Sequence, residues 1–346
     1  MREQQHVKFV LRHLPWIGRE LLKLQNPIIG IACAGVLWSL IVAGAWAQSY
    51  PEKPIRFVMP FPAGGGGDIL GRLISPQAAQ SLGQPIVIDN RGGAGGNIGI
   101  ELVAHSVADG YTILMGSAAL PINATLYRKL KYDPVKDFAT VTLLAKSPNL
   151  LMVNPSLSVK SVKDLIALAK SAPGTINYAS GGSGTTPHLA AELFKKVAEI
   201  DLVHVPYKGT APALIAVIGG EASLILPPAL TGLPFLKNGK LKALAITSID
   251  RAEALPDLPT VDESGLAGFE ATQWYGVLVP SATPAAIVDR LNREFVKVMQ
   301  TTEVKTKLLK DASIPIGSTS QKFASYLKEE FQKWAAVVTF SGARAD

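Results

Sequence analysis

Residues 60–68 read Pro-Phe-Pro-Ala-Gly-Gly-Gly-Gly-Asp and lie between a segment typical of a strand and one typical of a helix. The apolar run 55–59 predicts the strand, and residues 69–82 predict the helix. Glycines let the backbone come close to a bound group, and a helix that starts directly afterwards offers free N–H groups and the positive end of its dipole. The junction therefore predicts a loop that holds a small anion or carbonyl oxygen, with Asp68 as the helix cap.

The glycine run does not match the nucleotide-binding motifs. A phosphate loop needs Lys after its glycines, and a dinucleotide fingerprint needs glycines at i, i+2 and i+5. Neither this run nor the second glycine cluster, residues 91–99, has either spacing. A plain flexible turn remains the alternative, although flexible linkers are uncommon between the strand and the helix of an α/β unit.

The first 47 residues have the three parts of a secretory signal peptide. Five Lys or Arg residues precede an apolar stretch, residues 27–47, which ends in Ala45-Trp46-Ala47. We predict cleavage after Ala47; an uncleaved membrane anchor is the alternative, because about 20 apolar residues can span a bilayer. Cys33 is the only cysteine and lies in this segment, so the mature chain would have no disulfide, thiol nucleophile or Cys-metal site.

The composition and net charge limit the number of domains and the class of ligand. The chain has 346 residues, of which 48% are hydrophobic and 18% are charged, as expected for a globular protein of one large or two medium domains. Removing residues 1–47 takes away five Lys or Arg and two Asp or Glu, which lowers the net charge from +7 to +4. A mildly basic chain without an Arg/Lys block argues against nucleic acid and suits a small anionic ligand.

Further along, short apolar strands alternate with helix-like segments. We predict strands at residues 85–88, 112–116, 177–179, 201–205, 224–226 and 243–247. We predict helices at 97–104, 161–170, 187–197, 212–218, 285–300 and 320–338, with a short Lys-rich helix between the last two. This order is typical of an α/β fold whose parallel strands are covered by helices on both faces.

Two mostly apolar segments, residues 141–153 and 272–279, have the pattern of crossings between two such units. We therefore predict a two-lobed α/β fold joined by two hinge strands, as in binding proteins that close around a ligand. The predicted divisions are residues 1–47 for the signal peptide, 48–150 and 273–346 for the first domain, and 151–272 for the second, inserted domain.

Several motifs follow one another in a recognisable order: residues 60–68, 91–99, Asp109-Gly110-Tyr111-Thr112, 178–189, Val205-Pro206-Tyr207-Lys208-Gly209 and Trp274-Tyr275-Gly276. With them the mature chain resembles, over essentially its whole length, the substrate-binding proteins of tripartite tricarboxylate transporters, the Bordetella uptake gene (Bug) family. The resemblance implies a periplasmic, Venus-flytrap-like protein. Such a protein would bind a small carboxylated metabolite, do no chemistry on it, and deliver it to the membrane subunits of a transporter.

The resemblance further implies that two loops clamp a carboxylate of the ligand. One loop would contribute Phe61, Gly65, Gly66, Gly67 and Asp68, and the other Ser183, Gly184, Thr185 and Thr186. The residues themselves agree with this. Residues 183–186 lie directly before the helix that is predicted to begin at Pro187, so hydroxyls and N–H groups converge where an anion is stabilised.

Four more residues are candidates for ligand contact. Ser117 and Asn123 follow the third predicted strand, at the carboxyl edge where α/β sheets place ligands. Lys208 is either a cation for the ligand or a structural tether. Ser223 belongs to residues 222–228, an uncharged, proline-bearing stretch at a place where relatives commonly carry acidic residues. A buried ammonium group without a partner is costly, so we expect a ligand with an uncharged part beside its carboxylate.

Other functions are less well supported by the sequence. Residues 181–185 approach the nucleophile elbow of a Ser-dependent hydrolase but lack its final glycine, and His188 and His204 suit structural positions better than a catalytic base. We therefore predict no enzymatic activity, no cofactor, no metal and a monomer. A binding protein that presents its ligand to a membrane sensor, rather than to a transporter, remains an alternative, as does an anchored structural domain without a ligand.

Overall fold

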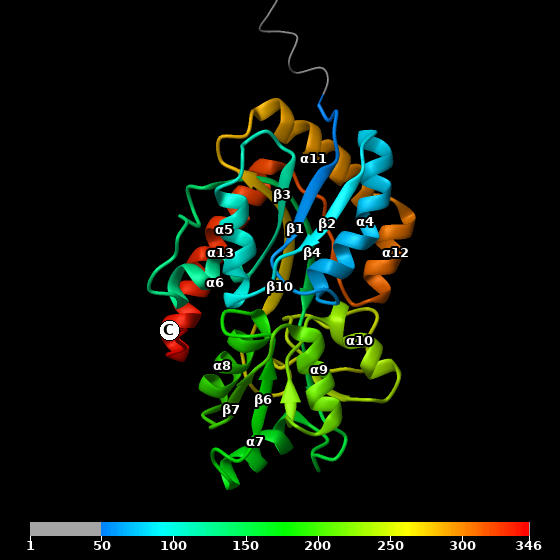
Figure 1. The fold of residues 1–346 in the computed structure, drawn as a ribbon. Coiled ribbons are helices and arrows are strands. Elements are labelled where there is room, and N and C mark those ends of the chain that lie inside the picture. Colours follow the sequence, from blue (N-terminus) through cyan, green and yellow to red (C-terminus); the bar gives the residue numbers. More distant parts are fainter. Residues whose placement is uncertain (1–49, 346) are drawn as a thin grey trace, which may run out of the picture. The chain divides into compact units, whose positions relative to one another are not determined.

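The computed structural model describes residues 50–345, which are built on two β-sheets (Figure 1). The first sheet has the strand order β11-β4-β10-β3-β1-β2. Its strands are β1 (Ile55–Met59), β2 (Ile86–Asn90), β3 (Thr112–Ser117), β4 (Phe138–Pro148), β10 (Thr272–Pro280) and β11 (Ile314–Pro315). The second sheet has the order β7-β6-β8-β5-β9. Its strands are β5 (Leu150–Val153), β6 (Asn177–Ser180), β7 (Val203–Pro206), β8 (Leu224–Ile225) and β9 (Lys242–Ile246).

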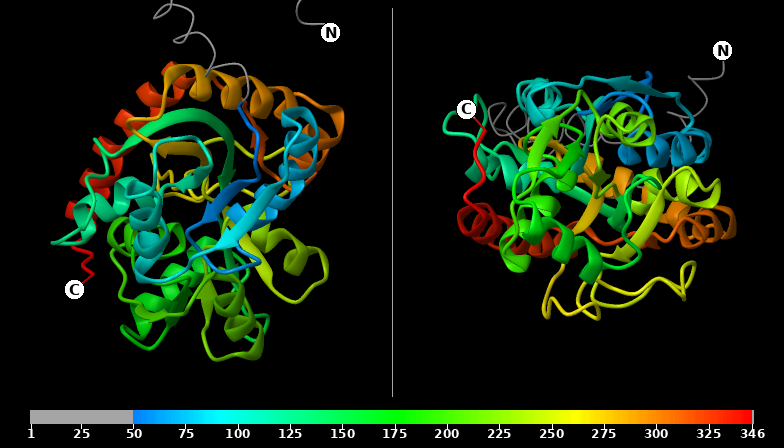
Figure 2. Two further views of the ribbon diagram at one scale, coloured as in Figure 1. Left: turned by 45° about the horizontal axis from the view of Figure 1, so that its top comes forward. Right: turned by 90° about the horizontal axis from the view of Figure 1, so that it is seen from below.

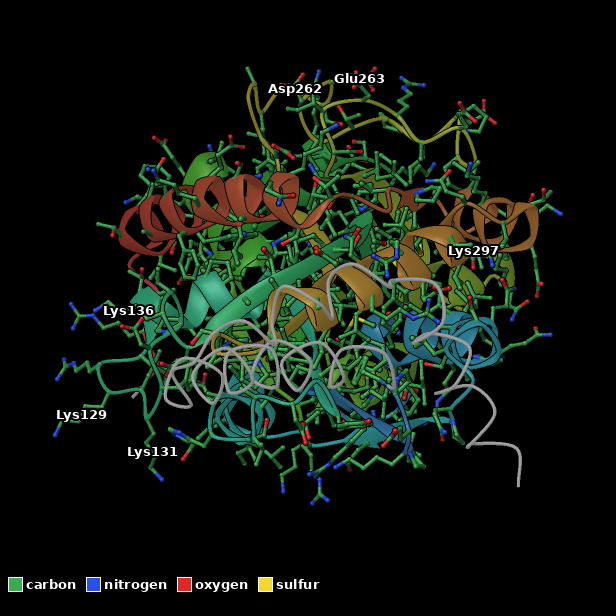
Figure 3. The ribbon with its side chains drawn as sticks, turned by 90° about the horizontal axis from the view of Figure 1, so that it is seen from above. Lys129, Lys131, Lys136, Asp262, Glu263 and Lys297 are labelled. Carbon is green, nitrogen blue, oxygen red and sulfur yellow. The ribbon has the colours of Figure 1, made fainter. Side chains whose placement is uncertain are left out.

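Each sheet with its helices is called a lobe here. Lobe 1 contains α4 (Gly66–Leu82), α5 (Asn97–Ala104), α6 (Ala119–Leu126), α11 (Ala285–Met299), α12 (Thr302–Lys310) and α13 (Ser320–Ser341). Lobe 2 contains α7 (Val162–Ser171), α8 (Thr186–Ala198), α9 (Thr210–Gly219) and α10 (Ala229–Lys237). Exposed charged side chains, for example those of Lys129, Lys136 and Lys297, point outward from lobe 1 (Figure 3).

The strand period of two places alternate residues on opposite faces of each sheet. In β1, the Phe57 ring lies 5.8 Å from the ring of Phe295 in α11, whereas Val58 belongs to the core that α13 covers. In β5, Leu151 and Val153 join the core beneath α7 and α8, whereas Met152 joins the core beneath α9. The apolar runs of the sequence are therefore strands that are covered on both faces.

Two segments of the chain join the lobes. The first leaves lobe 1 at the end of β4 and enters lobe 2 as β5, with only Asn149 between them. The second returns as β10, which pairs antiparallel with β4 from Thr272↔Pro148 to Pro280↔Phe138. All nine residues of β10 are buried. The predicted two-lobed α/β fold with two crossing strands is confirmed.

The sheets differ from the sequence expectation in one respect, because both are mixed rather than parallel. β1 pairs in parallel with β2 and β3, but β10 pairs antiparallel with β3 and β4, and β5 pairs antiparallel with β8 and β9. One crossing segment leaves lobe 1 and the other returns to it, so the two strands must run in opposite directions.

Two helices were not expected from the sequence. The sequence of α6 contains Pro121, and that of α10 contains Gly232 and Pro234. These residues suggest loops because proline lacks an N–H and glycine weakens a helix. Pro121 is nevertheless tolerated, since it lies in the first turn, where the N–H has no intrahelical acceptor.

Some predictions concern residues that the structure does not describe. The signal peptide at residues 1–47, the alternative membrane anchor and Cys33 all lie outside residues 50–345. Within the described part of the chain, no helix has the length and apolar character needed to cross a membrane. The division into domains at residues 150 and 272 stays a prediction, although the junctions fall near Asn149 and the start of β10.

Candidate functional site

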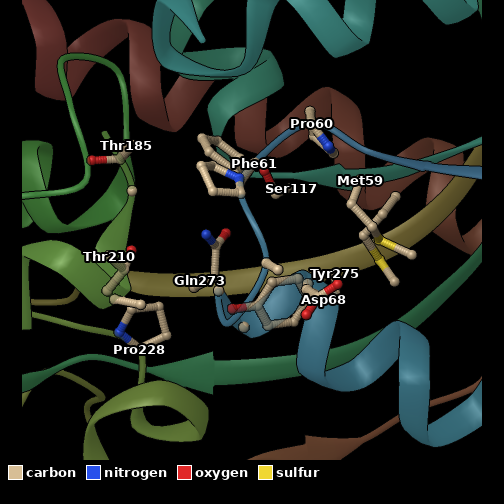
Figure 4. Close-up of a pocket in the computed structure, with 18 of the residues that line it drawn as sticks. Met59, Pro60, Phe61, Asp68, Ser117, Thr185, Thr210, Pro228, Gln273 and Tyr275 are labelled. Carbon is tan, nitrogen blue, oxygen red and sulfur yellow. The ribbon is translucent and has the colours of Figure 1, made fainter. Parts of the chain in front are cut away.

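A cavity of about 40 Å³ lies between the two lobes (Figure 4). Lobe 1 lines it with residues 59–63 and 65–68, Met115, Ser117, Gln273 and Tyr275, and lobe 2 lines it with Thr185, Pro187, residues 209–212 and Pro228.

Four helices begin at this cavity. Their first turns contribute residues 66–68 of α4, Pro187 of α8, Thr210 of α9 and, at the N-cap of α10, Pro228. None of the four has a side-chain cap. Of the six α-helices within residues 50–345 that begin elsewhere, α7, α12 and α13 are capped by a Ser or Thr hydroxyl, and α5, α6 and α11 are not. The first N–H groups of a helix have no intrahelical acceptor, and the positive end of its dipole favours an anion. The cavity is therefore suited to an anion held largely by the backbone.

Asp68 is the one charged residue among residues 50–345 that lines the cavity, and its carboxylate is bonded to neighbouring groups of lobe 1. Its carboxylate accepts hydrogen bonds from Gly64 N–H at 3.0 Å, Arg72 Nε at 3.0 Å and Asn90 Nδ2 at 3.1 Å. Burial alone would raise the pKa of Asp68, but these hydrogen bonds, with that of Arg72 foremost, lower it below its usual value. The carboxylate therefore braces the glycine loop.

The sequence assigned Asp68 a different place in the helix. α4 begins at Gly66 with Gly65 as its N-cap, so Asp68 is the third residue of the helix and is not the cap. From that position a carboxylate reaches back to an N–H before the helix, which is one half of a capping box. The two glycines extend the helix toward the cavity, because backbone without Cβ atoms fits there: a Cβ at Gly66 would lie 2.0 Å from Tyr275 Oη.

Gln273 and Tyr275 are cavity residues that the sequence analysis missed. The Oε1 atom of Gln273 accepts hydrogen bonds from the N–H groups of Ala118 and Trp274, both at 3.0 Å. Its Nε2 amide therefore remains a donor for the cavity that the side chain lines. Burial raises the pKa of Tyr275, so its hydroxyl stays protonated. Both side chains project from one face of β10, and the strand period within Gln-Trp-Tyr could have indicated them.

Some of the predicted loop residues of lobe 2 line the cavity, and others do not. Thr185 lines the cavity, and its hydroxyl donates to Gly182 O at 2.7 Å. Thr186 is fully buried, and its Oγ1 has no partner among the described residues. Ser183 lines a neighbouring chamber instead. In lobe 1, Ser117 lines the cavity beside Phe61.

Asn123 and Gly184 meet where the lobes touch. Asn123 is fully buried, and its Nδ2 donates to Gly95 O and Asn97 Oδ1, both at 3.0 Å. A Cβ at Gly184 would lie 2.1 Å from Asn123 Oδ1, and a Cβ at Gly95 would lie 2.3 Å from Ser183 O. We call these contacts the glycine seam. The seam lets the backbones of the two lobes approach more closely than any side chain would allow.

The two remaining candidates lie away from the cavity. Lys208 is exposed and lines the same neighbouring chamber as Ser183. Ser223 is bonded through its N–H and its hydroxyl to Asn177 Oδ1, at 2.7 and 2.9 Å, and does not line the cavity. Of residues 221–228, only Pro228 lines it, while Leu224 and Leu226 belong to the core of lobe 2.

Two stacked histidine rings pack next to residues 183–186, the predicted binding loop of lobe 2. The rings of His188 and His204 are stacked with centroids 4.4 Å apart, and Tyr178 stacks on the other side of His204 at 4.8 Å. His188 Nδ1 accepts from Gly184 N–H at 3.4 Å, and His204 Nε2 is 2.7 Å from Ser180 Oγ. Burial lowers the pKa of His188 to about 3 and that of His204 to about 4, so both rings are neutral at ordinary pH. This arrangement fits a structural role better than that of a catalytic base.

No group of three or more His, Cys, Asp or Glu that could hold a metal ion occurs within residues 50–345.

Comparison with known proteins gives consistent matches. Residues 70–342 match the family model described as the tripartite tricarboxylate transporter family receptor. The chain is 35% identical to Protein BugT of Bordetella pertussis over 318 residues, which cover 91% of this chain and 96% of that protein. An R. palustris protein solved with adipate superposes with a TM-score of 0.83 at 36% identity and covers 85% of this chain and 99% of that one. MatC of Rhodopseudomonas palustris, solved with bound malate, gives a TM-score of 0.80 at 33% identity and covers 84% of this chain and all of that one.

Acid should weaken the fold through the histidine stack. In the unfolded chain these rings bind protons near the usual pKa of 6.5, whereas in the fold they do so only near pH 3–4. The unfolded state therefore binds more protons in between, and the free energy of unfolding falls as pH drops from about 6.5 toward 4. Glu192 and Lys195, which are paired with each other at 2.9 Å, are the charged groups that face the stack. Urea unfolding measured between pH 7.5 and 4 checks this.

Two variants test whether the histidine stack causes this loss of stability in acid. His188→Gln keeps an acceptor for Gly184 N–H but cannot titrate, so the loss of stability on acidification should become smaller. His105→Gln changes an exposed histidine that is bonded to Lys131 O, and it should leave the loss unchanged. An equal loss in wild type and in His188→Gln would contradict the account.

Proposed function

Because the chain belongs to the tripartite tricarboxylate transporter receptor family, we propose that it captures a small carboxylated metabolite between its lobes and delivers it to the membrane subunits of such a transporter. Proteins of this family and fold are solute-binding receptors, so the prediction that the chain is not an enzyme is confirmed. The proposal concerns the ligand class, the binding residues and the delivery step.

The observation that carries the proposal is the set of four helix starts around a cavity that no Lys or Arg in the described part of the chain lines. An anion at one helix start gains about 0.3–1 kcal/mol, and up to about 2 kcal/mol where the site is partly buried. Several starts that act on one carboxylate therefore supply a substantial part of a micromolar binding energy, which is about 8 kcal/mol. The amide of Gln273 adds a side-chain donor.

The charges around the cavity also indicate that the ligand lacks an ammonium group. An ammonium group would need a carboxylate partner, and the only one in the lining, Asp68, is already paired with Arg72 at 3.0 Å. Two solved relatives carry adipate and malate, which have carboxylates and no ammonium group. We therefore expect this chain to take an organic acid rather than an amino acid.

The proposal also includes the cellular compartment in which the protein acts. A solved relative with 30% identity is described as the periplasmic binding protein BugD, and residues 1–47 have the pattern of a secretory signal peptide. We infer that the mature chain works in the periplasm, where a receptor meets solutes before a transporter does.

Gln273→Glu tests the cavity as the carboxylate site. The substitution keeps the shape and the acceptor oxygen but replaces the donor Nε2 with a negative oxygen, which repels a bound carboxylate. Affinity for adipate or malate should fall at least tenfold, a loss of about 1.4 kcal/mol. Isothermal titration calorimetry measures it. Aspartate and glutamate should bind more weakly than the organic acids.

Gln321→Glu is the matched control, since Gln321 is exposed and lies outside the cavity. It makes the same charge change and should leave the affinity as in wild type. Unchanged affinity in Gln273→Glu, with the variant folded, would place the ligand elsewhere.

Gly95→Ala tests the glycine seam. Its Cβ would lie 2.3 Å from Ser183 O, so the lobes could not close fully and ligand affinity should fall, although Gly95 does not line the cavity. Gly239→Ala is the control, because Gly239 has nearly the same backbone angle, φ +64° against +63°, with nothing within 4 Å. Small-angle scattering with and without ligand checks closure. Normal closure and affinity in Gly95→Ala would contradict the role of the seam.

A further inference from the structure

A second chamber, of about 640 Å³, lies beside the cavity and is lined by both lobes. Lobe 1 contributes residues 61, 62, 90, 92–96, 127, 344 and 345, and lobe 2 contributes residues 181–183 and 207–209. Pro62 and Gly209 line both spaces and form a wall between them, because a Cβ at Gly209 would lie only 3.3 Å from Pro62 Cγ. We call this second space the outer chamber. It is distinct from the proposed carboxylate site.

The two lobes meet along the outer chamber. The Tyr127 hydroxyl of lobe 1 donates a hydrogen bond to Ser183 O of lobe 2 at 3.4 Å, and a Cβ at Gly95 would lie 2.3 Å from the same oxygen. All three residues line the chamber. The distance between its walls therefore depends on the relative position of the lobes, which a ligand held between them would fix.

The charge of the outer chamber is one-sided. Lys208 and Arg344 line it, and no Asp or Glu among residues 50–345 does. Neither cation forms an ion pair with another residue of that range. Lys208 follows β7 in lobe 2, whereas Arg344 follows α13, whose C-terminal end lies beside α8 (Figure 2). Both side chains are exposed, so an acidic group that enters the chamber meets a cation from each lobe.

The uncharged lining has the composition of a protein interface. Three aromatic side chains line the outer chamber together with Arg344: Phe61, Tyr127 and Tyr207. Aromatic residues and Arg are enriched in protein–protein interfaces and carry much of their binding energy, whereas Asp and Glu are depleted there. Seven glycines also line the chamber, and their bare backbone lets another chain approach closely: Gly92, Gly93, Gly95, Gly96, Gly181, Gly182 and Gly209.

The loop of residues 92–96 holds its shape before any partner arrives. Gly93, Ala94, Gly95 and Gly96 all have positive φ, and Ala94 adopts φ +49° although it carries a Cβ. Such strain persists only where the surroundings fix the backbone. A loop that is already ordered loses little conformational freedom on binding, which favours affinity. The second glycine cluster of the sequence thus forms a preorganised wall.

The size and shape of the chamber decide between the kinds of acidic occupant. Pockets of roughly 300–1,000 Å³ hold molecules of many atoms, so a single inorganic anion would fill little of this space. A bilayer surface is flat on this scale and does not enter a concave chamber. A protruding segment of another protein can place carboxylates beside both cations and an apolar side chain against the aromatic rings.

We propose that the outer chamber docks an acidic segment of the transporter's membrane subunits, whose carboxylates bind Lys208 and Arg344. The proposal rests on the proposed function, in which the protein delivers its ligand to those subunits. Because the chamber belongs to both lobes, the ligand and the docked segment favour the same lobe position. Each therefore raises the affinity for the other.

A fluorescently labelled hexaglutamate peptide, with hexaglutamine as its neutral match, tests the docking chemistry by anisotropy in low salt. Hexaglutamate should bind the wild-type protein and hexaglutamine should not. Lys208→Gln and Arg344→Gln should each weaken hexaglutamate binding about two- to fivefold, which is the range for exposed charge pairs. Saturating adipate or malate should strengthen it at least threefold. Lys297→Gln, which removes an exposed lysine of α11 outside both spaces, should have no effect (Figure 3).

Several results of this experiment would overturn the proposal. Equal hexaglutamate binding by the wild type and the Lys208→Gln/Arg344→Gln double variant would refute the docking site, and so would binding that neither adipate nor malate changes. Displacement of the peptide by an equal concentration of inorganic phosphate would assign the chamber to small anions. Binding of the protein to phosphatidylglycerol vesicles through these two cations, in place of the peptide, would assign it to a membrane surface.

Uptake of radiolabelled adipate or malate tests the partner. In host cells without their own copy of the gene, the Lys208→Glu/Arg344→Glu double variant should support uptake severalfold more slowly than the wild type, although calorimetry should give both proteins the same ligand affinity. Normal uptake, or an equal loss of ligand affinity, would refute the docking site and leave the proposed function standing. Uptake that does not depend on the wild-type gene at all would contradict the proposed function itself.

Discussion

The unmet hydrogen-bonding capacity of helix starts is the constraint on which this structure depends. α4, α8, α9 and α10 begin without side-chain caps at one cavity, and none of the Lys or Arg side chains that the structure describes lines it to hold an anion. Leaving those N–H groups without acceptors costs stability, and a bound carboxylate would supply the acceptors. In parallel β-α units the helices begin at the carboxyl edge of the sheet, so facing two such edges toward each other produces this arrangement.

The crossing strands make that arrangement possible. β4 and β10 are paired along the full length of β10, which is buried throughout, so they form a stable connection between the lobes. The lobes also pack on each other beside the cavity, where α13 lies against α8 and Leu189 of α8 is buried in the core of lobe 1. In the glycine seam, bare backbone meets Ser183 O and Asn123 Oδ1 with no side chain between. The Gln273 amide and the Tyr275 hydroxyl reach the cavity from this hinge, which couples ligand contact to lobe position.

Much of the fold could be predicted from the sequence, because strand and helix periods are local. The run at residues 55–82 indicated a strand, a glycine loop and a helix, and the two apolar crossings indicated the hinge. The elements that were missed had misleading local signals. Pro234 lies inside α10, and the antiparallel pairing of β10 depends on β3 and β4, which precede it by many residues in the chain. The candidate site was harder to predict. Asp68 lines the cavity but braces the loop, and Ser223 is turned toward Asn177, because contacts distant in sequence decide where each side chain points.

A crystal structure of the mature chain with bound adipate or malate is the most direct test of backbone capture. We expect one carboxylate in the cavity between the lobes, with its oxygens about 2.7–3.2 Å from N–H groups at the starts of α4 and α8 or α9, and with Gln273 Nε2 as a further donor. A carboxylate in that cavity paired with a Lys or Arg side chain, or a ligand bound outside the cavity, would contradict the account.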